Sequence, residues 1–147
     1  MFDLSEGSLL ESRARIGAAW EAGAATFPVR NPATGQIVAE VADLGAADTR
    51  RAVAAAKEAQ KDWAARTAKE RAGVLRRWYE LILEHKADLA RLLTAEMGKP
   101  LAEAEGEIAY GAGFVEWFAE EAKRVYGDTI PGHQPRSEER RVGKECP

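Results

Sequence analysis

The first patterned stretch of the chain, between Ile16 and Leu44, alternates apolar and polar positions as β-strands do. Residues 37, 39 and 41 are apolar and project to one side of an extended segment, while mainly polar residues lie between them. The segment 31–35 contains a proline, which restricts φ, and a glycine, which permits positive φ, so it is typical of a turn. The pattern predicts a β-hairpin with strands near 26–29 and 36–41.

From Ala46 onwards the apolar positions recur with a helical period. An alanine-rich stripe predicts a first helix over 46–65. Thr67 and Glu70 have the spacing of a capping box and predict the start of a second helix. Its apolar period continues to Met97, so one uninterrupted helix of roughly 45 Å is expected at 1.5 Å per residue.

A third helix is predicted from about Pro100 to Tyr126. It has two neighbouring apolar stripes, which require two packing partners. Its three interior glycines each cost up to about 1 kcal/mol relative to alanine, so another backbone is expected to approach closely. Tight helix packing explains such glycines more simply than ligand contact. The aromatic stripe consists of Tyr110, Phe114 and Trp117, and the glycines are Gly106, Gly111 and Gly113.

Composition places the chain among globular proteins. It has 147 residues, 46% hydrophobic and 31% charged, which suits one domain with a sizeable core. With 21 Lys+Arg against 24 Asp+Glu the net charge is −3, and no basic stripe for nucleic acid is present. No apolar run reaches the length of about 20 residues that a membrane span needs, and the first residues lack a secretory signal pattern. We therefore expect no nucleic-acid or membrane partner and a cytoplasmic location.

Residue types that carry chemistry are present but do not converge. His85 and His133 have no partner at metal-ligand spacing. Glu103, Glu105 and Glu107 alternate along a helix and so spread around it, which indicates a solvated face. Basic neighbours of Cys146 would lower its thiol pKa, although an inert tail cysteine is the favoured interpretation. No glycine-rich loop follows a strand. The residues alone predict no catalytic, cofactor-binding or metal-binding site.

Five short segments together carry a family resemblance. They are NPATG at 31–35, TAKER at 67–71, EMGKPLAEA at 96–104, FVEWFAEE at 114–121 and YGDTIPGH at 126–133. The chain resembles the N-terminal part of aldehyde dehydrogenases, and within that superfamily it is most similar to succinate-semialdehyde dehydrogenases. The implied fold class is α/β in the full-length protein. This fragment would contribute an N-terminal β-hairpin and three long α-helices.

The resemblance also implies a chemistry. In that family a cysteine thiolate attacks the aldehyde, hydride passes to NAD or NADP, and water hydrolyses the thioester. The nucleophile, the glutamate base, the oxyanion donor and the cofactor glycines all belong to later segments of a full-length chain. We therefore expect a fragment that is inactive and binds no cofactor by itself. The full-length enzyme would take a small aldehyde substrate and form a homo-oligomer.

Two roles follow from the resemblance position by position. Tyr110 and Phe114, one helical turn apart, match positions that line the substrate tunnel, with plain core packing as the alternative. Glu96 matches a position that helps to hold a structural monovalent cation in some members. For Glu96 we favour a solvent-exposed residue at a helix end, so no metal site is predicted.

The chain is predicted to have three parts: a lead over 1–15, the aldehyde dehydrogenase part over 16–134, and a tail over 135–147. The tail departs from the family pattern. Its residues 136–146, RSEERRVGKEC, are the translation of the start of a common sequencing-library adapter. We therefore expect a non-native tail without structure or function, in which Cys146 is not the family nucleophile.

A second hypothesis belongs to a different functional class. The chain would be a free-standing helical interaction module that docks a partner through Tyr110, Phe114 and Trp117. The two hypotheses differ in whether the isolated chain is a stable monomer.

Overall fold

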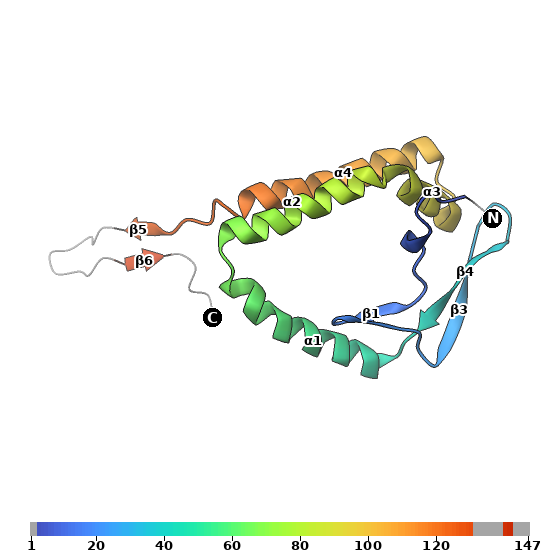
Figure 1. The fold of residues 1–147 in the computed structure, drawn as a ribbon, viewed down its shortest axis with the longest axis horizontal. Coiled ribbons are helices and arrows are strands. Elements are labelled where there is room, and N and C mark those ends of the chain that lie inside the picture. Colours follow the sequence, from blue (N-terminus) through green and yellow to red (C-terminus); the bar gives the residue numbers. More distant parts are fainter. Residues whose placement is uncertain (1–2, 131–139, 143–147) are drawn as a thin grey trace.

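The structure, a computed structural model, describes residues 3–130 and 140–142. Helices α2 and α4 lie side by side, α3 packs at one end of this pair, and α1 stands apart (Figure 1). In chain order the elements are η1 (Gly7–Leu9), β1 (Ala14–Ile16), β2 (Ala19–Glu21), β3 (Ala25–Arg30), β4 (Ile37–Asp43), α1 (Ala46–Ala65), α2 (Ala68–Glu84), α3 (Lys86–Met97), α4 (Leu101–Glu121), β5 (Asp128–Ile130) and β6 (Arg140–Val142).

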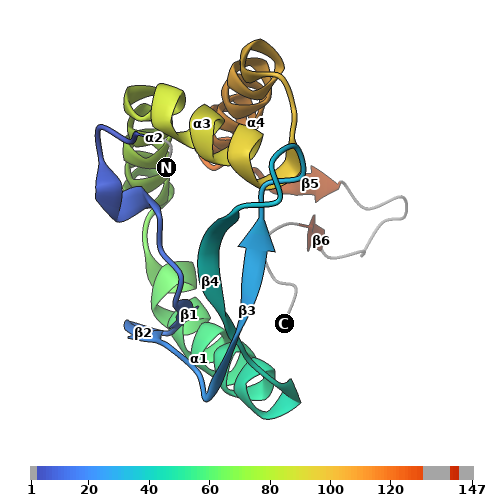
Figure 2. The same cartoon turned by 90° about the vertical axis from the view of Figure 1, so that its right-hand side faces the viewer.

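The described strands form three antiparallel pairs, β1–β2, β3–β4 and β5–β6. The predicted hairpin is confirmed as β3–β4, with Phe27 opposite Val41. Its turn is held by Asn31, whose Oδ1 accepts hydrogen bonds from the backbone N–H groups of Ala33 (2.9 Å) and Thr34 (3.2 Å). This turn reaches the junction of α3 and α4 (Figure 2).

The pair β1–β2 was not predicted as a hairpin, because each strand has only three residues and offers too short a pattern. Its two-residue turn is opened by Gly17 at φ +58° and rests on α1 near Ala55. Arg51 of α1 adds an ion pair to Glu21 of β2, at 2.6 Å. These contacts join α1 to the β1–β2 pair.

The structure also differs from the expectation for the tail. Arg140–Val142 forms β6 and pairs with β5, although no structure was expected after residue 134. Backbone pairing needs no particular side-chain pattern, so composition alone does not reveal it. His133, Cys146 and most of the tail lie outside the described residues.

The second predicted helix is not one rod, and the described residues therefore contain four α-helices where three were predicted. Its start is confirmed: the hydroxyl of Thr67 accepts a hydrogen bond from the Glu70 N–H, and the Thr67 N–H donates to the Glu70 carboxylate at 2.8 Å. At His85, φ is −99° and ψ is 14°, outside the helical range, and the chain changes direction. The apolar period continues through the break, and for that reason the sequence pattern did not show it.

Helix α4 ends at Glu121, five residues before the predicted end at Tyr126. The N–H groups of Lys123 and Arg124 bond to carbonyls three residues earlier, which tightens and closes the last turn. Val125 and Tyr126, which the prediction placed inside this helix, are largely exposed.

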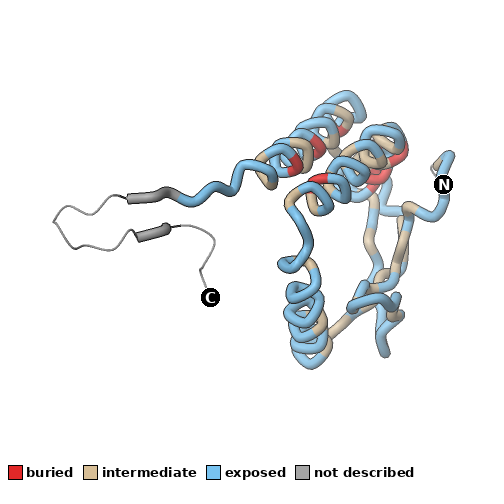
Figure 3. The backbone as a smooth tube through the Cα atoms, turned by 60° about the vertical axis from the view of Figure 1, so that its left-hand side comes forward, coloured by how far each residue is buried: buried red, intermediate tan, exposed pale blue. Residues whose placement is uncertain are grey.

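The core of the described residues lies where α2, α3 and α4 meet (Figure 3). All but one of its hydrophobic side chains are alanines, whose small size lets the helix backbones approach closely. Two ion pairs tie α4 to its neighbours, Arg76–Glu116 at 2.9 Å and Lys86–Glu105 at 3.6 Å. Helix α1 has no buried residue. The buried hydrophobic residues are Ala72, Ala90, Leu92, Ala95, Ala104, Ala112 and Ala119.

Candidate functional site

Four aromatic side chains on α4 form an exposed apolar surface, here called the aromatic face. They follow the spacing i, i+4, i+7, i+8 and so share one side of the helix. Tyr110 and Phe114 stack edge to face, with ring centroids 4.9 Å apart and an angle of 84°. Together with Gly113 the four rings line a shallow groove of about 410 Å³. The exposed fractions are Tyr110 69%, Phe114 50%, Trp117 62% and Phe118 59%.

The opposite side of α4 packs against α2 and α3 through buried alanines. Ala112 lies two residues after Tyr110, about 200° around the helix, so the alanine side and the aromatic face point in opposite directions. Both predicted apolar stripes are present, and the aromatic one is the more exposed, although Tyr110 and Phe114 also border a hollow shared with side chains of α2 and α3. The close backbone approach expected at the helix glycines is not found in the described part of the chain, where nothing lies within 4 Å of a Cβ built at any of them.

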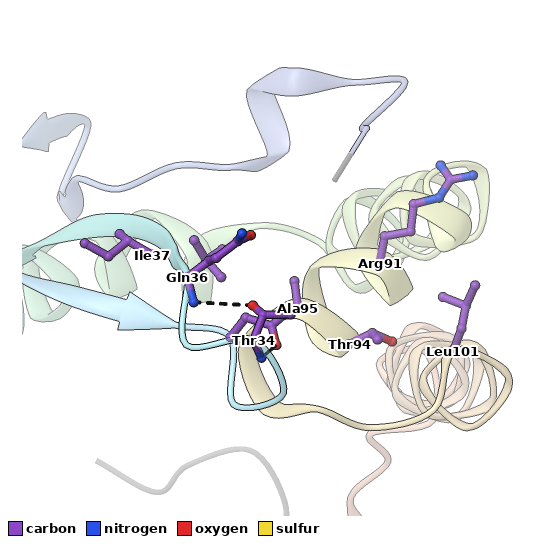
Figure 4. A pocket seen from close by; sticks show the side chains of 9 residues that line it. Thr34, Gln36, Ile37, Arg91, Thr94, Ala95 and Leu101 are labelled. Carbon is purple, nitrogen blue, oxygen red and sulfur yellow. Dashed lines mark hydrogen bonds between the residues drawn. The ribbon is translucent and has the colours of Figure 1, made fainter. Parts of the chain in front are cut away.

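A second hollow, of about 480 Å³, lies between the β3–β4 turn and α3 (Figure 4). Its polar lining consists of Asn31, Thr34, Gln36, Arg91 and Thr94. The hydroxyl of Thr94 is buried and has no hydrogen-bond partner among the residues that the structure describes. The lining includes no carboxylate, imidazole or thiol that would act as a base or a strong nucleophile. This hollow has polar groups for contact but no set of groups for catalysis.

Sequence reasoning missed one buried polar residue, Asp88 in the first turn of α3. Its carboxylate accepts a hydrogen bond from the Glu6 N–H at 2.8 Å and one from Arg91 at 2.7 Å. The Glu6 N–H, ahead of Arg91, holds the pKa of Asp88 below its ordinary value, although burial acts in the opposite direction. The sequence signal that could have revealed Asp88 is an acidic residue in the first turn of a helix. Asp88 attaches the N-terminal lead to α3.

This contact predicts an acid-dependent loss of stability. Because the pKa of Asp88 is lower in the folded state, its contribution is fully present above the ordinary aspartate pKa of about 3.9 and is lost as pH falls through the folded-state pKa. Asp88→Asn should therefore destabilise the chain at pH 7 and have a progressively smaller effect below about pH 4. Urea unfolding of both proteins across this range measures the difference. An equal effect at all pH values would contradict the assigned contact.

The other predicted candidates do not form a site. His85 is half-buried at the α2–α3 break, Glu96 is exposed in the last turn of α3, and Glu103 is exposed on α4. Glu105 pairs with Lys86, and Glu107 accepts a hydrogen bond from Lys99. Among residues 3–130 and 140–142, no group of three His, Cys, Asp or Glu side chains gathers closely enough to hold a metal ion. None of the helices described is both long and apolar enough to cross a membrane.

The described residues do not fit a nicotinamide cofactor. A dinucleotide site needs parallel strands and a glycine-rich turn from a strand into a helix. The strands in the described ranges are antiparallel pairs, and the residues preceding the four helices are Gly45, Thr67, His85 and Pro100, none of them in such a motif.

Comparison with known proteins identifies the class to which this fold belongs. The model of the aldehyde dehydrogenase family matches residues 20–144, and the chain belongs to that family. It is 58% identical over 134 residues to glutarate-semialdehyde dehydrogenase of Pseudomonas aeruginosa, covering 90% of this chain and 28% of the relative. It is 53% identical over 133 residues to succinate-semialdehyde dehydrogenase [NADP(+)] of Escherichia coli, covering 89% of this chain and 28% of the relative.

A solved structure agrees in fold. The crystal structure of an NADP-dependent enzyme of E. coli superposes with a TM-score of 0.87 at 52% identity, covering 90% of this chain and 28% of that chain. The predicted resemblance and fold class are thus confirmed. The chain spans a little more than a quarter of the length of these relatives, as a fragment of such an enzyme would.

Proposed function

We propose that this chain is the N-terminal part of an NAD(P)-dependent dehydrogenase that oxidises succinate semialdehyde, or the homologous glutarate semialdehyde, to the dicarboxylate. The proposal rests chiefly on the high identity to enzymes named for these two substrates over nine-tenths of the chain. The complete protein would be a cytoplasmic homo-oligomer. The choice between the two semialdehydes, and between NAD and NADP, belongs to residues outside this chain.

Within that enzyme, Tyr110 and Phe114 would line the entrance through which the aldehyde passes. Their edge-to-face pair presents an apolar surface, and at least half of each residue is exposed. Such a surface suits the methylene chain of a semialdehyde, whereas the cationic donors that bind its carboxylate most strongly are absent from this pair, in which the Tyr110 hydroxyl is the one donor. The reaction itself is assigned to the remaining part of the enzyme, so the isolated chain would have no dehydrogenase activity.

A chimera tests this function. The matched segment of the P. aeruginosa relative is replaced by residues 1–134 of this chain, and reduction of NAD and NADP is followed with succinate and glutarate semialdehyde. We expect turnover within about tenfold of the parent enzyme, because a correct scaffold preserves the transition-state contacts made elsewhere. The complete 147-residue chain alone should show none. A folded but inactive chimera, or activity of the chain alone, would contradict the proposal.

The proposed tunnel-lining role of Tyr110 can be tested in the same chimera by measuring KM. Tyr110→Ala should raise KM for the semialdehyde several-fold with little change in kcat, since it removes substrate contact rather than chemistry. Val53→Ala, an exposed apolar position on α1, serves as the matched control. Identical KM values for the two variants would leave Tyr110 with a packing role only.

The exposed aromatic face also favours a second candidate, a free-standing interaction module. Sedimentation of the isolated chain separates the two. A stable, monodisperse monomer supports the module, and aggregation or poor expression supports a fragment whose helices lack their packing partner.

A further inference from the structure

We infer that Lys99 is a specificity-determining residue of the proposed dehydrogenase, because it neutralises Glu107 beside the substrate entrance and so allows an aldehyde that carries a carboxylate to enter. The inference rests on the proposed function, including the tunnel-lining role of Tyr110 and Phe114. Lys99 acts through Glu107 and is therefore a positioning residue, not a catalytic one.

The first argument is the place of Glu107 on α4. At about 100° per residue it lies about 60° from Tyr110 and about 20° from Phe114, so its carboxylate is on the same side of the helix as these rings. The three residues also border one hollow of about 560 Å³, together with side chains of α2 and α3. Among the described residues that border this hollow, Glu107 is the only charged one. Its negative charge therefore lies next to the proposed entrance.

The second argument is the partner of Glu107. The ammonium of Lys99 donates a hydrogen bond to Oε2 of Glu107. Lys99 lies in the turn before α4, which Gly98 permits at φ +79° and Pro100 stiffens. The Lys99 side chain is 25% exposed and that of Glu107 is 47% exposed, so the cation is the less solvated member of the pair. As long as both are charged, the pair presents no net charge to an incoming substrate.

The third argument is the charge of the proposed substrates. Succinate semialdehyde and glutarate semialdehyde each carry a carboxylate, which is ionised at neutral pH. Glu107 without its partner would repel this anion, and the repulsion disappears when Lys99 neutralises it. A neutral aldehyde is insensitive to either state. Lys99 therefore favours the entry of anionic aldehydes specifically.

Kinetics of the chimera that contains residues 1–134 test the inference. With succinate semialdehyde, Lys99→Met should raise KM roughly three- to tenfold at unchanged kcat, as expected for like charges close together near a protein surface. Lys99→Arg keeps the charge and should stay within about twofold of the unsubstituted chimera. Butanal has the same carbon chain length without the carboxylate. Its inhibition constant against succinate semialdehyde should be the same in all three proteins.

Two further variants separate charge from structure. Lys99→Met/Glu107→Gln removes both members of the pair and should restore the KM of the unsubstituted chimera, whereas damage to the turn before α4 would persist. Lys86→Met is the matched control, because it breaks the ion pair with Glu105 on the opposite side of α4 from the aromatic face. It removes the same charge and should leave KM unchanged.

Three results would overturn the inference alone, since each requires an active chimera. They are an unchanged KM in Lys99→Met, an equal loss for succinate semialdehyde and butanal, and a double variant that is no better than Lys99→Met. An unsubstituted chimera without activity would instead contradict the proposed function, and the inference with it.

Discussion

Replacing Gly98 by alanine is expected to lower the free energy of unfolding by about 2 kcal/mol or more, because two separate costs combine at this position. Gly98 caps α3 at φ +79°, a left-handed conformation that costs a side-chain-bearing residue roughly 1–2 kcal/mol. A Cβ at this position would also lie 2.9 Å from Cγ of Pro32, so the β3–β4 turn would have to move away from the α3–α4 junction. Urea unfolding measures the loss as a lower midpoint at unchanged slope.

Alanine substitutions at two other glycines distinguish the cost of backbone strain from the cost of the contact with Pro32. Gly35 has φ +72°, and no described atom lies within 4 Å of its Cβ position, so Gly35→Ala should cost about 1 kcal/mol from backbone strain alone. Gly73 lies inside α2 in open space, and Gly73→Ala should stabilise the chain by up to about 1 kcal/mol. If Gly98→Ala costs no more than Gly35→Ala, the contact with Pro32 does not constrain the fold.

Enlarging Ala112 to leucine is expected to cost about 1–3 kcal/mol, through overpacking of the core. Ala112 has no exposed surface and lies on the side of α4 that packs against α2 and α3. The added carbons would force these helices apart and lengthen the Arg76–Glu116 ion pair that links α2 to α4. The measurement is again the urea midpoint, with helix content followed by circular dichroism.

Ala109→Leu is the matched control. It makes the same change on the same helix at an exposed position, where substitutions usually stay within about 0.5 kcal/mol. Equal effects of the two variants would mean that the alanine side of α4 is not packed as described.

Local signals predicted the parts of the fold that local interactions build. The hairpin β3–β4 depends on a turn in which Asn31 bonds to residues two and three positions ahead. The start of α2 depends on Thr67 and Glu70, three residues apart. Contacts at such short range are encoded by neighbouring residues, so a pattern of neighbours is enough to find them.

The parts that were missed depend on contacts distant in sequence. The α3 side of the break at His85 is held by Asp88, which accepts a hydrogen bond from Glu6, 82 positions away. No window of neighbouring residues contains that pair. Helix α4 ends at Glu121, and Val125 and Tyr126 beyond it are exposed, although their apolar period continues that of the helix.

The candidate site likewise contains features that local sequence spacing predicts and features that depend on distant contacts. The pairing of Tyr110 with Phe114 follows from their i, i+4 spacing, and sequence was sufficient to place them together. The hollow between the β3–β4 turn and α3 is lined by Asn31 and Arg91, which are 60 positions apart, so no sequence pattern predicted it. That α4 has two apolar faces was readable from periodicity, whereas which of the two is packed was not.

By itself, the sequence determined the family, the β3–β4 hairpin, the capping of α2 and the two-sided apolar character of α4, because each depends on residue types at short, regular spacing. Only the tertiary structure decided that α2 and α3 are separate helices, that small alanines take the packed side of α4, and that the aromatic face remains open. These outcomes depend on which surfaces meet. Apolar burial is non-directional, so it specifies that a face must be covered but not by which neighbour.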